Sequence, residues 1–350
     1  MSKYSVIADK LREEIKAGVY AKSGKLPTEY ELVSRFNVSR QTVRQAISSL
    51  KSEGAVYQIQ GSGTFVAKDI PEKKGAESAF KNIFVICTYI SEYIFPSIVR
   101  GIESTLNGTG FRIHIAATGN KVELERKILN DVIDLKECDG IIVEGSKTGF
   151  PNPNINLYRK IADMGVPLVF LHCSYQELPD SVVVGMDDRE GGRIAATKLI
   201  ESGCRRMLGI FKSDDQQGLL RYAGFSEGLL QSGLALDNME VRWYTTEDII
   251  DHGMAIDRAM IDVLVKKGFD GVVCYNDQVA AALVRDLTRN GIPVPRIISF
   301  DDSYLARTSA IHFDSLGHRK EELGVLAATK IRNMVNGMKE TSSFLDWIVE

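Results

Sequence analysis

The sequence predicts an α/β protein in two parts: an N-terminal winged helix-turn-helix and a larger body of doubly wound parallel sheets. Two helix start signals lie close together near the N-terminus, and a strand-like hairpin follows them. From residue 81 onward, short apolar strands alternate with amphipathic segments of helical length, the pattern of parallel sheets covered by helices. The body of about 270 residues is large for one such sheet and suits two.

The N-terminal segment predicts an amphipathic helix at residues 4–17. Its apolar side chains recur at helical spacing, so we expect Val6, Ile7, Leu11 and Ile15 to face inward. Lys3 precedes this helix and is a candidate phosphate contact. The opening MSKYSVIADKLREE lacks the apolar core of a signal peptide.

Residues 26–47, LPTEYELVSRFNVSRQTVRQAI, predict two helices joined by a short turn. Thr28, followed three residues later by Glu31, forms a capping box that opens a helix burying Leu32, Val33 and Phe36. Asn37 suits the turn because Asn adopts left-handed backbone angles at low cost. Ser39 then caps a second helix, whose inward face consists of Val43, Ala46, Ile47 and Leu50.

The second helix leaves polar side chains on its outward face, namely Arg40, Gln41, Arg44 and Gln45. Arg binds the O6 and N7 atoms of guanine with two hydrogen bonds, and Gln does the same with N6 and N7 of adenine. The pattern therefore predicts a helix-turn-helix that reads a major groove. Two core helices with solvated charges are the alternative for this stretch taken alone.

A hairpin is predicted after the second helix, which Gly54 ends. The segments AVYQIQ and TFVAK alternate apolar and polar residues on either side of Gly61, Ser62 and Gly63, as the wing of a winged helix does. The stretch LPTEYELVSRFNVSRQTVRQAISSLKSEG and the tip QGSGTFV resemble, in the same order, the DNA-binding domain of the GntR family of bacterial transcription regulators. The resemblance covers residues 1–68, the head, and implies double-stranded operator DNA as a partner.

We predict that the head contacts DNA through Lys3, Glu29, Arg40, Gln41, Thr42, Arg44, Gln60, Gly61 and Gly63.

The distribution of charge supports a division of the chain into a DNA-binding head and a separate remainder. Residues 1–68 contain eleven Lys and Arg against six Asp and Glu, so the head carries +5 and the remainder −8 of the total net charge of −3. A basic end on an acidic remainder suits a nucleic-acid module attached to a part that need not touch DNA.

Residues 69–80, DIPEKKGAESAF, are predicted to link the head to a body that spans residues 81–350. The composition is globular, with 44% hydrophobic and 25% charged residues, and no apolar run approaches the roughly 20 residues that cross a bilayer. The five cysteines have no metal spacing and lie mostly in or beside apolar runs, so we expect buried free thiols. Together these features predict a cytoplasmic protein.

The body contains predicted strands at 83–88, 111–117, 139–143, 167–171, 182–186, 207–211, 270–275 and 297–300. Polar residues follow several of these strands, and aromatic residues (Tyr89, Tyr93, Phe95, Tyr175) lie nearby in the sequence. Because ligands of open parallel sheets bind beyond the carboxyl ends of the strands, this arrangement predicts a pocket for a small hydroxyl-rich molecule. Strand ends are often polar in any protein, so the set as a whole carries the prediction.

The motifs FPSIVRGIE, VGMDDREGGRIAATKLIESGCRRMLGIF, RYAGF, CYNDQVAAAL and ISFDDS resemble the effector domains of the LacI family. That family shares the two-lobed fold of periplasmic sugar-binding proteins, and the resemblance spans residues 83–318. It implies that sugar binds at Arg221, Asn276 and Asp301. His172 stands where many members have Asp, which leaves the identity of the sugar open. The full predicted set is Tyr93, Phe95, Glu144, Lys147, His172, Arg221, Asn276, Asp301 and His318.

A GntR-type head on a LacI-type body is similar to the arabinose repressor family of Gram-positive bacteria, which implies L-arabinose as the sugar. Another sugar or a nucleoside is the alternative for a regulator of this architecture. The resemblance implies a homodimer that places two heads on successive major grooves of a two-fold operator. Whether the sugar weakens or strengthens DNA binding is left open by the sequence.

An enzyme is the chief alternative from another class. Nucleotide chemistry has little support, because no strand leads into a phosphate-binding loop, and the glycines of residues 190–193 lie in a helical pattern that close helix packing explains. Asp187-Asp188 and Asp301-Asp302 are candidate paired carboxylates, although Asp at a helix start is more often a cap. His172 and His318 lack ligand spacing for a metal, so neither a metal nor a cofactor is expected. A free sugar-binding protein is disfavoured by the basic head.

Overall fold

The computed structural model describes residues 3–21, 23–52, 55–59, 63–66, 80–90, 93–234, 239–248, 258–309 and 311–349. The chain divides into two compact units, Met1–Ala79 and Phe80–Glu350, which contain the head and the body. Of the predicted linker 69–80, Phe80 alone falls within these ranges. Among the helices of the described ranges, none combines the length and apolar character needed to cross a membrane.

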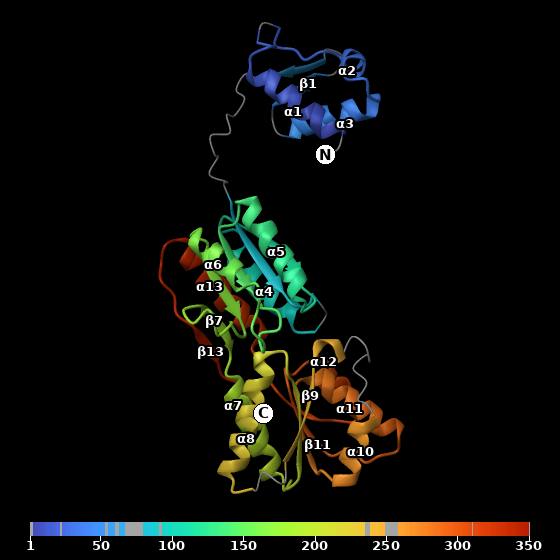
Figure 1. Cartoon of the computed structure of the whole chain (residues 1–350), viewed down its shortest axis with the longest axis vertical. Helices are drawn as coiled ribbons and strands as arrows, with labels where there is room; N and C mark the ends of the chain where they lie inside the picture. Colours follow the sequence, from blue (N-terminus) through green and yellow to red (C-terminus); the bar gives the residue numbers. More distant parts are fainter. Residues whose placement is uncertain are drawn as a thin grey trace. The chain divides into compact units, whose positions relative to one another are not determined.

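The head consists of three helices and a hairpin: α1 (Lys3–Lys16), α2 (Glu29–Phe36), α3 (Arg40–Ser52), β1 (Val56–Ile59) and β2 (Gly63–Val66) (Figure 1). Its core includes Ile7, Ala8, Leu11, Ile15, Leu32, Val43, Ala46, Ile47 and Leu50. The prediction for Val6 is wrong, because this side chain is 51% exposed. Since α1 packs against α3, the buried face of α1 is centred on Ile7 and Leu11, and Ala8 takes the inward place expected for Val6.

The predicted helix signals of the head are confirmed. Thr28 and Glu31 form both halves of the capping box, with the Glu31 backbone N–H donating to the Thr28 hydroxyl and Glu31 accepting from the Thr28 N–H. Asn37 ends α2 in the left-handed region at φ 50°. The Ser39 hydroxyl accepts from the Thr42 N–H at 3.2 Å, so it caps α3 as expected.

The hairpin is antiparallel, with Val56 opposite Val66 and Ile59 opposite Gly63. A bridge between Lys25 and Phe65 attaches it to the segment before α2. The predicted tip residues Gln60, Gly61 and Ser62 lie outside the described residues, as does the predicted helix stop Gly54.

The first lobe of the body has a sheet of parallel strands in the order β13-β7-β6-β5-β3-β4. Its elements are β3 (Lys81–Cys87), α4 (Phe95–Leu106), β4 (Phe111–Ala117), α5 (Val122–Leu135), β5 (Gly140–Val143), α6 (Ile155–Asp163), β6 (Leu168–Leu171), β7 (Val182–Met186), α13 (Lys320–Val335) and β13 (Ser343–Leu345). Figure 1 shows α13, coloured red, among the green and cyan elements of this lobe, although it follows the second lobe in the sequence.

The second lobe has a parallel sheet in the order β12-β11-β10-β8-β9. Its elements are α7 (Asp188–Glu201), β8 (Met207–Lys212), α8 (Gln216–Gln231), β9 (Met239–Tyr244), α10 (Arg258–Lys267), β10 (Gly271–Cys274), α11 (Asp277–Arg289), β11 (Arg296–Phe300), α12 (Tyr304–Thr308) and β12 (Asp314–Leu316). The predicted doubly wound sheets, and each predicted strand, are thereby confirmed within a residue or two at the ends. All five cysteines are free thiols, and four of them are buried, also as predicted.

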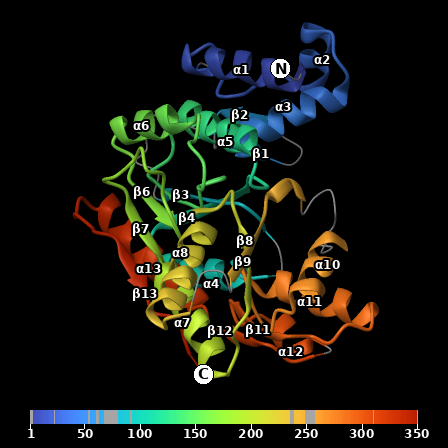
Figure 2. The same ribbon diagram turned by 60° about the horizontal axis from the view of Figure 1, so that its bottom comes forward.

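Helices α7 and α8 lie side by side in both views (Figure 1, Figure 2). Glycines permit this contact: a Cβ on Gly192 would lie 2.0 Å from the Arg221 carbonyl oxygen, and one on Gly224 would lie 1.7 Å from the Arg189 carbonyl oxygen. Because only glycine fits so close an approach, the prediction that residues 190–193 serve helix packing is confirmed. The contact brings Arg221 of α8 over the start of α7.

Candidate functional site

The outward face of the head presents two arginines that share one carboxylate. The Arg40 Nε lies 2.7 Å from Glu29 Oε2, and the Arg44 Nε lies 3.0 Å from Glu29 Oε1. Hydrogen bonding to Arg40 lowers the pKa of Glu29 although burial opposes it, and Arg44 adds to the lowering. The arginine side chains remain 51% and 60% exposed, so their remaining N–H groups are accessible to DNA.

The other predicted DNA contacts are placed as follows. Gln41 is exposed beside Arg40, and Thr42 is half-buried with its hydroxyl 2.8 Å from that of Ser39. Gly63 begins β2 at φ 119°, a conformation that L side chains rarely adopt. Lys3 starts α1, but its side chain, like Gln60 and Gly61, lies outside what the structure describes.

The body has a pocket of about 290 Å³ at the carboxyl ends of the strands, with walls from both lobes. Six of the predicted sugar-binding residues line it: Tyr93, Phe95, Glu144, Arg221, Asn276 and Asp301. These residues come from distant parts of the sequence. Tyr93 and Asp301 are 208 positions apart and lie on different lobes, yet the Tyr93 hydroxyl donates to Asp301 Oδ2 at 2.6 Å. Burial, then the negative charge of Asp301, raises the pKa of Tyr93 well above its ordinary value, so its hydroxyl stays protonated and able to donate.

Arg221 lies in the pocket wall with only 2% of its surface exposed, and several neighbouring groups fix its guanidinium. Its Nε lies 2.8 Å from Asp188 Oδ1, and another guanidinium N–H donates to the carbonyl oxygen of Tyr275. The guanidinium also faces the rings of Tyr275, Phe300 and Trp347 at 4.4–5.1 Å. Burial disfavours its charge, but the carboxylates of Asp188 and Asp301 outweigh burial and raise its pKa. Arg221 is thus a fixed cation, and its partner is Asp188 rather than the Asp214 or Asp215 that sequence proximity favours.

Two further lining residues have their polar atoms oriented by the backbone. The side-chain oxygen of Asn276 caps α11 by accepting from the Val279 N–H at 3.1 Å, which leaves the amide N–H groups for the pocket. Glu144 Oε2 accepts from the backbone N–H of Thr88 at 2.8 Å and also from its hydroxyl.

Asp301 stands in the left-handed region at φ 98°, a strained conformation of the kind that clusters at binding sites.

The structure does not bring Lys147, His172 and His318 to the lining of this pocket. Lys147 pairs across the lobes with Glu247 and lies 3.7 Å from Asp214. His172 is buried beside a small adjoining recess, with Nε2 3.7 Å from Glu144 Oε1. His318 packs behind it, 5.5 Å between ring centroids, and burial lowers its pKa well below the ordinary value.

The lining also contains residues outside the predicted sugar-binding set: Thr88, Tyr89, Ile94, Lys212, Asp215, Gln217, Tyr244, Tyr275 and Gln278. Of these, Thr88 and Lys212 belong to the polar strand ends that predict the pocket, and Tyr89 was expected nearby. Lys212 is the last residue of β8, so its place at a strand end was a usable signal. Its Nζ lies 2.6 Å from Asp215 Oδ2, and the two nearby aspartates raise its pKa although burial opposes them. Tyr175, expected near the pocket, is instead buried against Glu125 in the first lobe.

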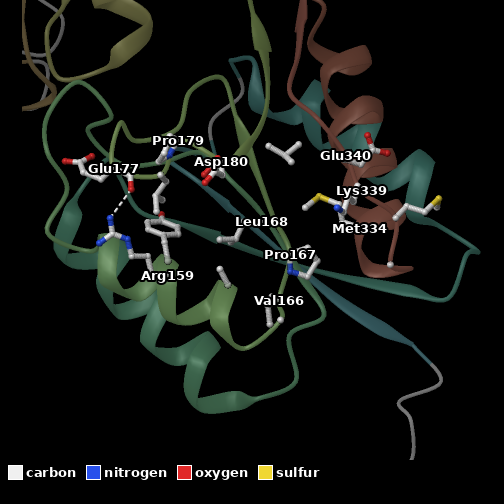
Figure 3. Close-up of a pocket in the computed structure, with 18 residues that line it drawn as sticks. Arg159, Val166, Pro167, Leu168, Glu177, Pro179, Asp180, Met334, Lys339 and Glu340 are labelled. Atoms are coloured by element: carbon white, nitrogen blue, oxygen red, sulfur yellow. Dashed lines mark hydrogen bonds between the residues drawn. The ribbon is translucent and has the colours of Figure 1, made fainter.

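A larger groove of about 810 Å³ lies on the first lobe alone, at the amino ends of β6 and β7. Figure 3 shows Arg159 and Glu177 on one side of it, with Met334, Lys339 and Glu340 on the other. Pro167, just before β6, and Leu168, its first residue, lie between them (Figure 3). Because ligands of open parallel sheets bind at the opposite, carboxyl ends, the smaller pocket between the lobes is the candidate binding site.

The candidate paired carboxylates have structural partners. Asp187 caps α7 by accepting from the Glu190 N–H at 2.9 Å, while Asp188 pairs with Arg221. Asp302 pairs with Arg307 at 2.6 Å. Within the described part of the chain, no group of three or more His, Cys, Asp or Glu residues is arranged to hold a metal ion.

Comparison with known families assigns both parts of the chain. Residues 3–66 match the family of bacterial regulatory proteins named gntR, and residues 196–344 match the periplasmic binding protein-like domain. Solved structures share the fold of the body: the transcription regulator CcpA of Lactococcus lactis has a TM-score of 0.66 at 22% identity, covering 77% of this chain and 96% of that one. A periplasmic binding protein/LacI transcriptional regulator from Alkaliphilus metalliredigens, complexed with D-xylulofuranose, has a TM-score of 0.63 at 22% identity, covering 77% and 97%. Head and body together define a transcription regulator with an effector-binding domain.

Relatives along the full chain identify the family. The chain is 37% identical to the arabinose metabolism transcriptional repressor of Halalkalibacterium halodurans, with 98% of this chain and 92% of that protein covered. It is 34% identical to the protein of the same name from Geobacillus stearothermophilus, with 96% and 92% covered. The chain belongs to this family of arabinose metabolism transcriptional repressors. The predicted repressor architecture is confirmed, and the enzyme alternative is set aside.

Proposed function

We propose that this chain is a homodimeric repressor that binds operator DNA through its winged helices and releases it when L-arabinose occupies the pocket between the lobes. The observation that carries the proposal is the pocket itself, which is built jointly by both lobes. A ligand held by both lobes favours one relative arrangement of them, as a sugar-controlled switch requires.

The pocket has the size and chemistry for a neutral monosaccharide. Its volume of about 290 Å³ lies at the lower end of the range for small-molecule pockets, which disfavours a longer saccharide. The cations Lys212 and Arg221 each pair with a carboxylate of the protein, so among the described lining residues no free positive charge favours an anionic ligand. Tyr, Phe and Ile side chains supply apolar walls for the faces of a sugar ring.

Arabinose is proposed on the basis of the relatives, whose names state arabinose metabolism. The same fold accepts different sugars in other proteins, one of which is complexed with D-xylulofuranose and another with cellobiose. The choice of sugar is therefore a property of the side chains around the pocket. Of these, Glu144, Arg221 and Asp301 are each oriented by a hydrogen bond to another residue of the protein.

The head is proposed to read DNA with Arg40 and Arg44, which Glu29 holds side by side on the exposed face of α3. Phosphate contacts supply most of the affinity, and the arginines supply sequence choice. Two copies of the chain match the two-fold symmetry of such operators. A coupling of about 1–3 kcal/mol between sugar and DNA binding is enough to produce release.

The test begins with an operator selected from a pool of random DNA by the full-length chain. Calorimetric titration with L-arabinose, D-xylose and D-ribose then measures which sugar binds, and mobility shift measures which sugar releases the operator. We expect L-arabinose to do both. Strong binding of another pentose without binding of L-arabinose would overturn the proposed sugar, while the absence of a selected operator would overturn the proposed head function.

A further inference from the structure

The segment that follows β5 binds the second lobe outside the sugar pocket. Lys147 makes an ion pair with Glu247 and lies 3.7 Å from Asp214, both residues of the second lobe. Next to it, the Gly149 N–H donates to the Asp214 carbonyl oxygen at 3.1 Å. None of Lys147, Asp214 and Glu247 lines the pocket.

Asn120, three residues after β4, joins the same contact from a second direction. Its amide N–H groups donate to the Thr246 hydroxyl at 2.6 Å and to Asp215 Oδ1 at 3.2 Å. Its side-chain oxygen accepts from the backbone N–H of Lys147 at 2.8 Å. Asn120 therefore fixes the position of Lys147 while it binds the second lobe itself.

Glu125 of α5 holds this segment from the side of the first lobe. It is fully buried, and its oxygens accept from the Ser146 N–H at 2.9 Å and from the side chains of Asn152 and Asn154, each at 2.8 Å. The hydroxyls of Tyr158 and Tyr175 complete the set. A buried carboxylate with five donors is held in one position, so the segment that bears Lys147 has a rigid base.

The charges facing Lys147 are matched to it. Asp214 is fully buried, and although burial raises its pKa, the charge of Lys212 and hydrogen bonds from Thr246 together outweigh burial and keep the pKa lowered. Hydrogen bonding to Lys147 lowers the pKa of Glu247, whose side chain is 57% exposed. The ion pair thus has a buried part and a solvent-exposed part.

We propose that Lys147, Glu247 and Asp214 form a latch between the lobes, which strengthens sugar binding by favouring the closed arrangement without contacting the sugar. The inference rests on the proposed function, because it assumes that sugar binds between the lobes. It assigns Lys147 a positioning role in place of the sugar contact expected from the sequence.

The latch acts through the population of the closed arrangement. Apparent affinity for a ligand falls in proportion to the fraction of protein in the competent state, so loss of the latch weakens sugar binding. L-arabinose is neutral and adds no charge of its own, so a partly exposed ion pair between the lobes contributes salt dependence to its binding. A latch therefore makes the affinity for a neutral sugar depend on ionic strength.

The test uses the full-length chain with Glu247→Gln and Glu247→Lys, and it measures the Kd for L-arabinose by calorimetry. A half-exposed ion pair supports an effect of about two- to fivefold for Glu247→Gln, and repulsion from Lys147 makes the effect of Glu247→Lys larger. The dependence of Kd on NaCl between about 0.05 and 0.5 M should be reduced in Glu247→Gln. Glu240→Gln is the matched control, because Glu240 pairs with Arg242 and Lys267 within the second lobe, and its Kd should equal that of the wild type.

A double-mutant cycle identifies the partner. Once Lys147→Met is present, Glu247→Gln should have little further effect on the Kd. Additive effects of the two substitutions would overturn the latch and would support a direct contact of Lys147 with the sugar. An unchanged Kd in both Glu247 variants, with normal sugar binding by the wild type, would overturn the latch alone. Absence of sugar binding by the wild type would instead contradict the proposed function.

Discussion

Replacing Arg221 with alanine perturbs both the sugar pocket and the packing beneath it. The wild-type guanidinium is 2% exposed and neutralises Asp188, which is also buried. Removing one partner of a buried ion pair leaves an uncompensated charge, which costs about 3–5 kcal/mol of folding free energy. Arg221→Ala is therefore expected to destabilise the second lobe as well as to weaken sugar binding.

A matched variant separates these two effects. Arg221→Met with Asp188→Ala removes both charges, and replacing a buried ion pair by apolar side chains is often close to neutral for stability. The methionine remains able to pack among the rings of Tyr275, Phe300 and Trp347. If Arg221 donates one charged hydrogen bond to the sugar, the double variant loses about 1.5–3 kcal/mol of affinity, or roughly ten- to hundredfold.

Urea unfolding followed by tryptophan fluorescence measures the first effect, since both tryptophans of the chain, Trp243 and Trp347, pack in the second lobe. Calorimetry with L-arabinose measures the second, and operator binding without sugar is the control that should not change. Wild-type stability of Arg221→Ala would refute the argument from the buried pair. Wild-type sugar affinity of the double variant would refute the place of Arg221 in the site.

Three other predictions concern the head and the second lobe. Arg44→Ala should cost about 1–3 kcal/mol of affinity for the selected operator and much less for scrambled DNA, by mobility shift; an equal loss on both would mean that Arg44 binds phosphate. Gly63→Ala should weaken operator binding and leave sugar binding intact, because Gly63 has φ 119° and a Cβ there would lie 2.5 Å from Lys25 Cε; unchanged affinity in a folded variant would contradict a DNA-facing wing. Burial, then the charge of Asp301, raises the pKa of Asp277 to about 6. The folded state thus holds this proton at a higher pH than the unfolded state, whose pKa is about 3.9, so the contribution of Asp277 to stability falls by about 2–3 kcal/mol as pH rises from about 4 to 6. Asp277→Asn should remove that fall, and identical pH profiles of urea unfolding for the two proteins would contradict it.

The helix caps and the turn of the head could be predicted from the sequence, because the residues that form them interact with near neighbours in the chain. Thr28, Glu31, Asn37 and Ser39 act within three residues of their own positions, so spacing alone identifies the caps and the turn. Val6 was misplaced because the apolar residues of α1 fit two neighbouring faces. Packing against α3, which spacing cannot show, decides between them.

The strands of the body with continuous or frequent apolar residues were predicted, and β9 and β13 were missed. Central strands such as β5 (Gly140–Val143) are continuous apolar runs. The edge strand β9 (Met239–Tyr244) mixes charged and aromatic residues and is only partly buried, so it gives no such run. Strand β13 (Ser343–Leu345) has three residues and completes the first sheet after the chain has passed through the second.

The site was predicted as a set of strand ends, but its pairings were not. Sequence proximity favours Asp214 or Asp215 as the partner of Arg221, whereas the glycine-mediated contact of α7 with α8 supplies Asp188, which is 33 positions away. The same holds for Lys147, whose partner Glu247 is 100 positions away on the other lobe. Side chains at strand ends share an edge of the sheet, yet which of them meet depends on how two lobes close.

The most direct test of sugar-controlled DNA release is a titration of the labelled operator complex of the full-length chain with L-arabinose, followed by fluorescence anisotropy. The wild type should release the operator over the same concentration range in which calorimetry shows the pocket filling, and the double variant Arg221→Met/Asp188→Ala should retain the operator throughout. Retention of the operator by the wild type at a sugar concentration that saturates the pocket would contradict the proposed coupling between the two sites.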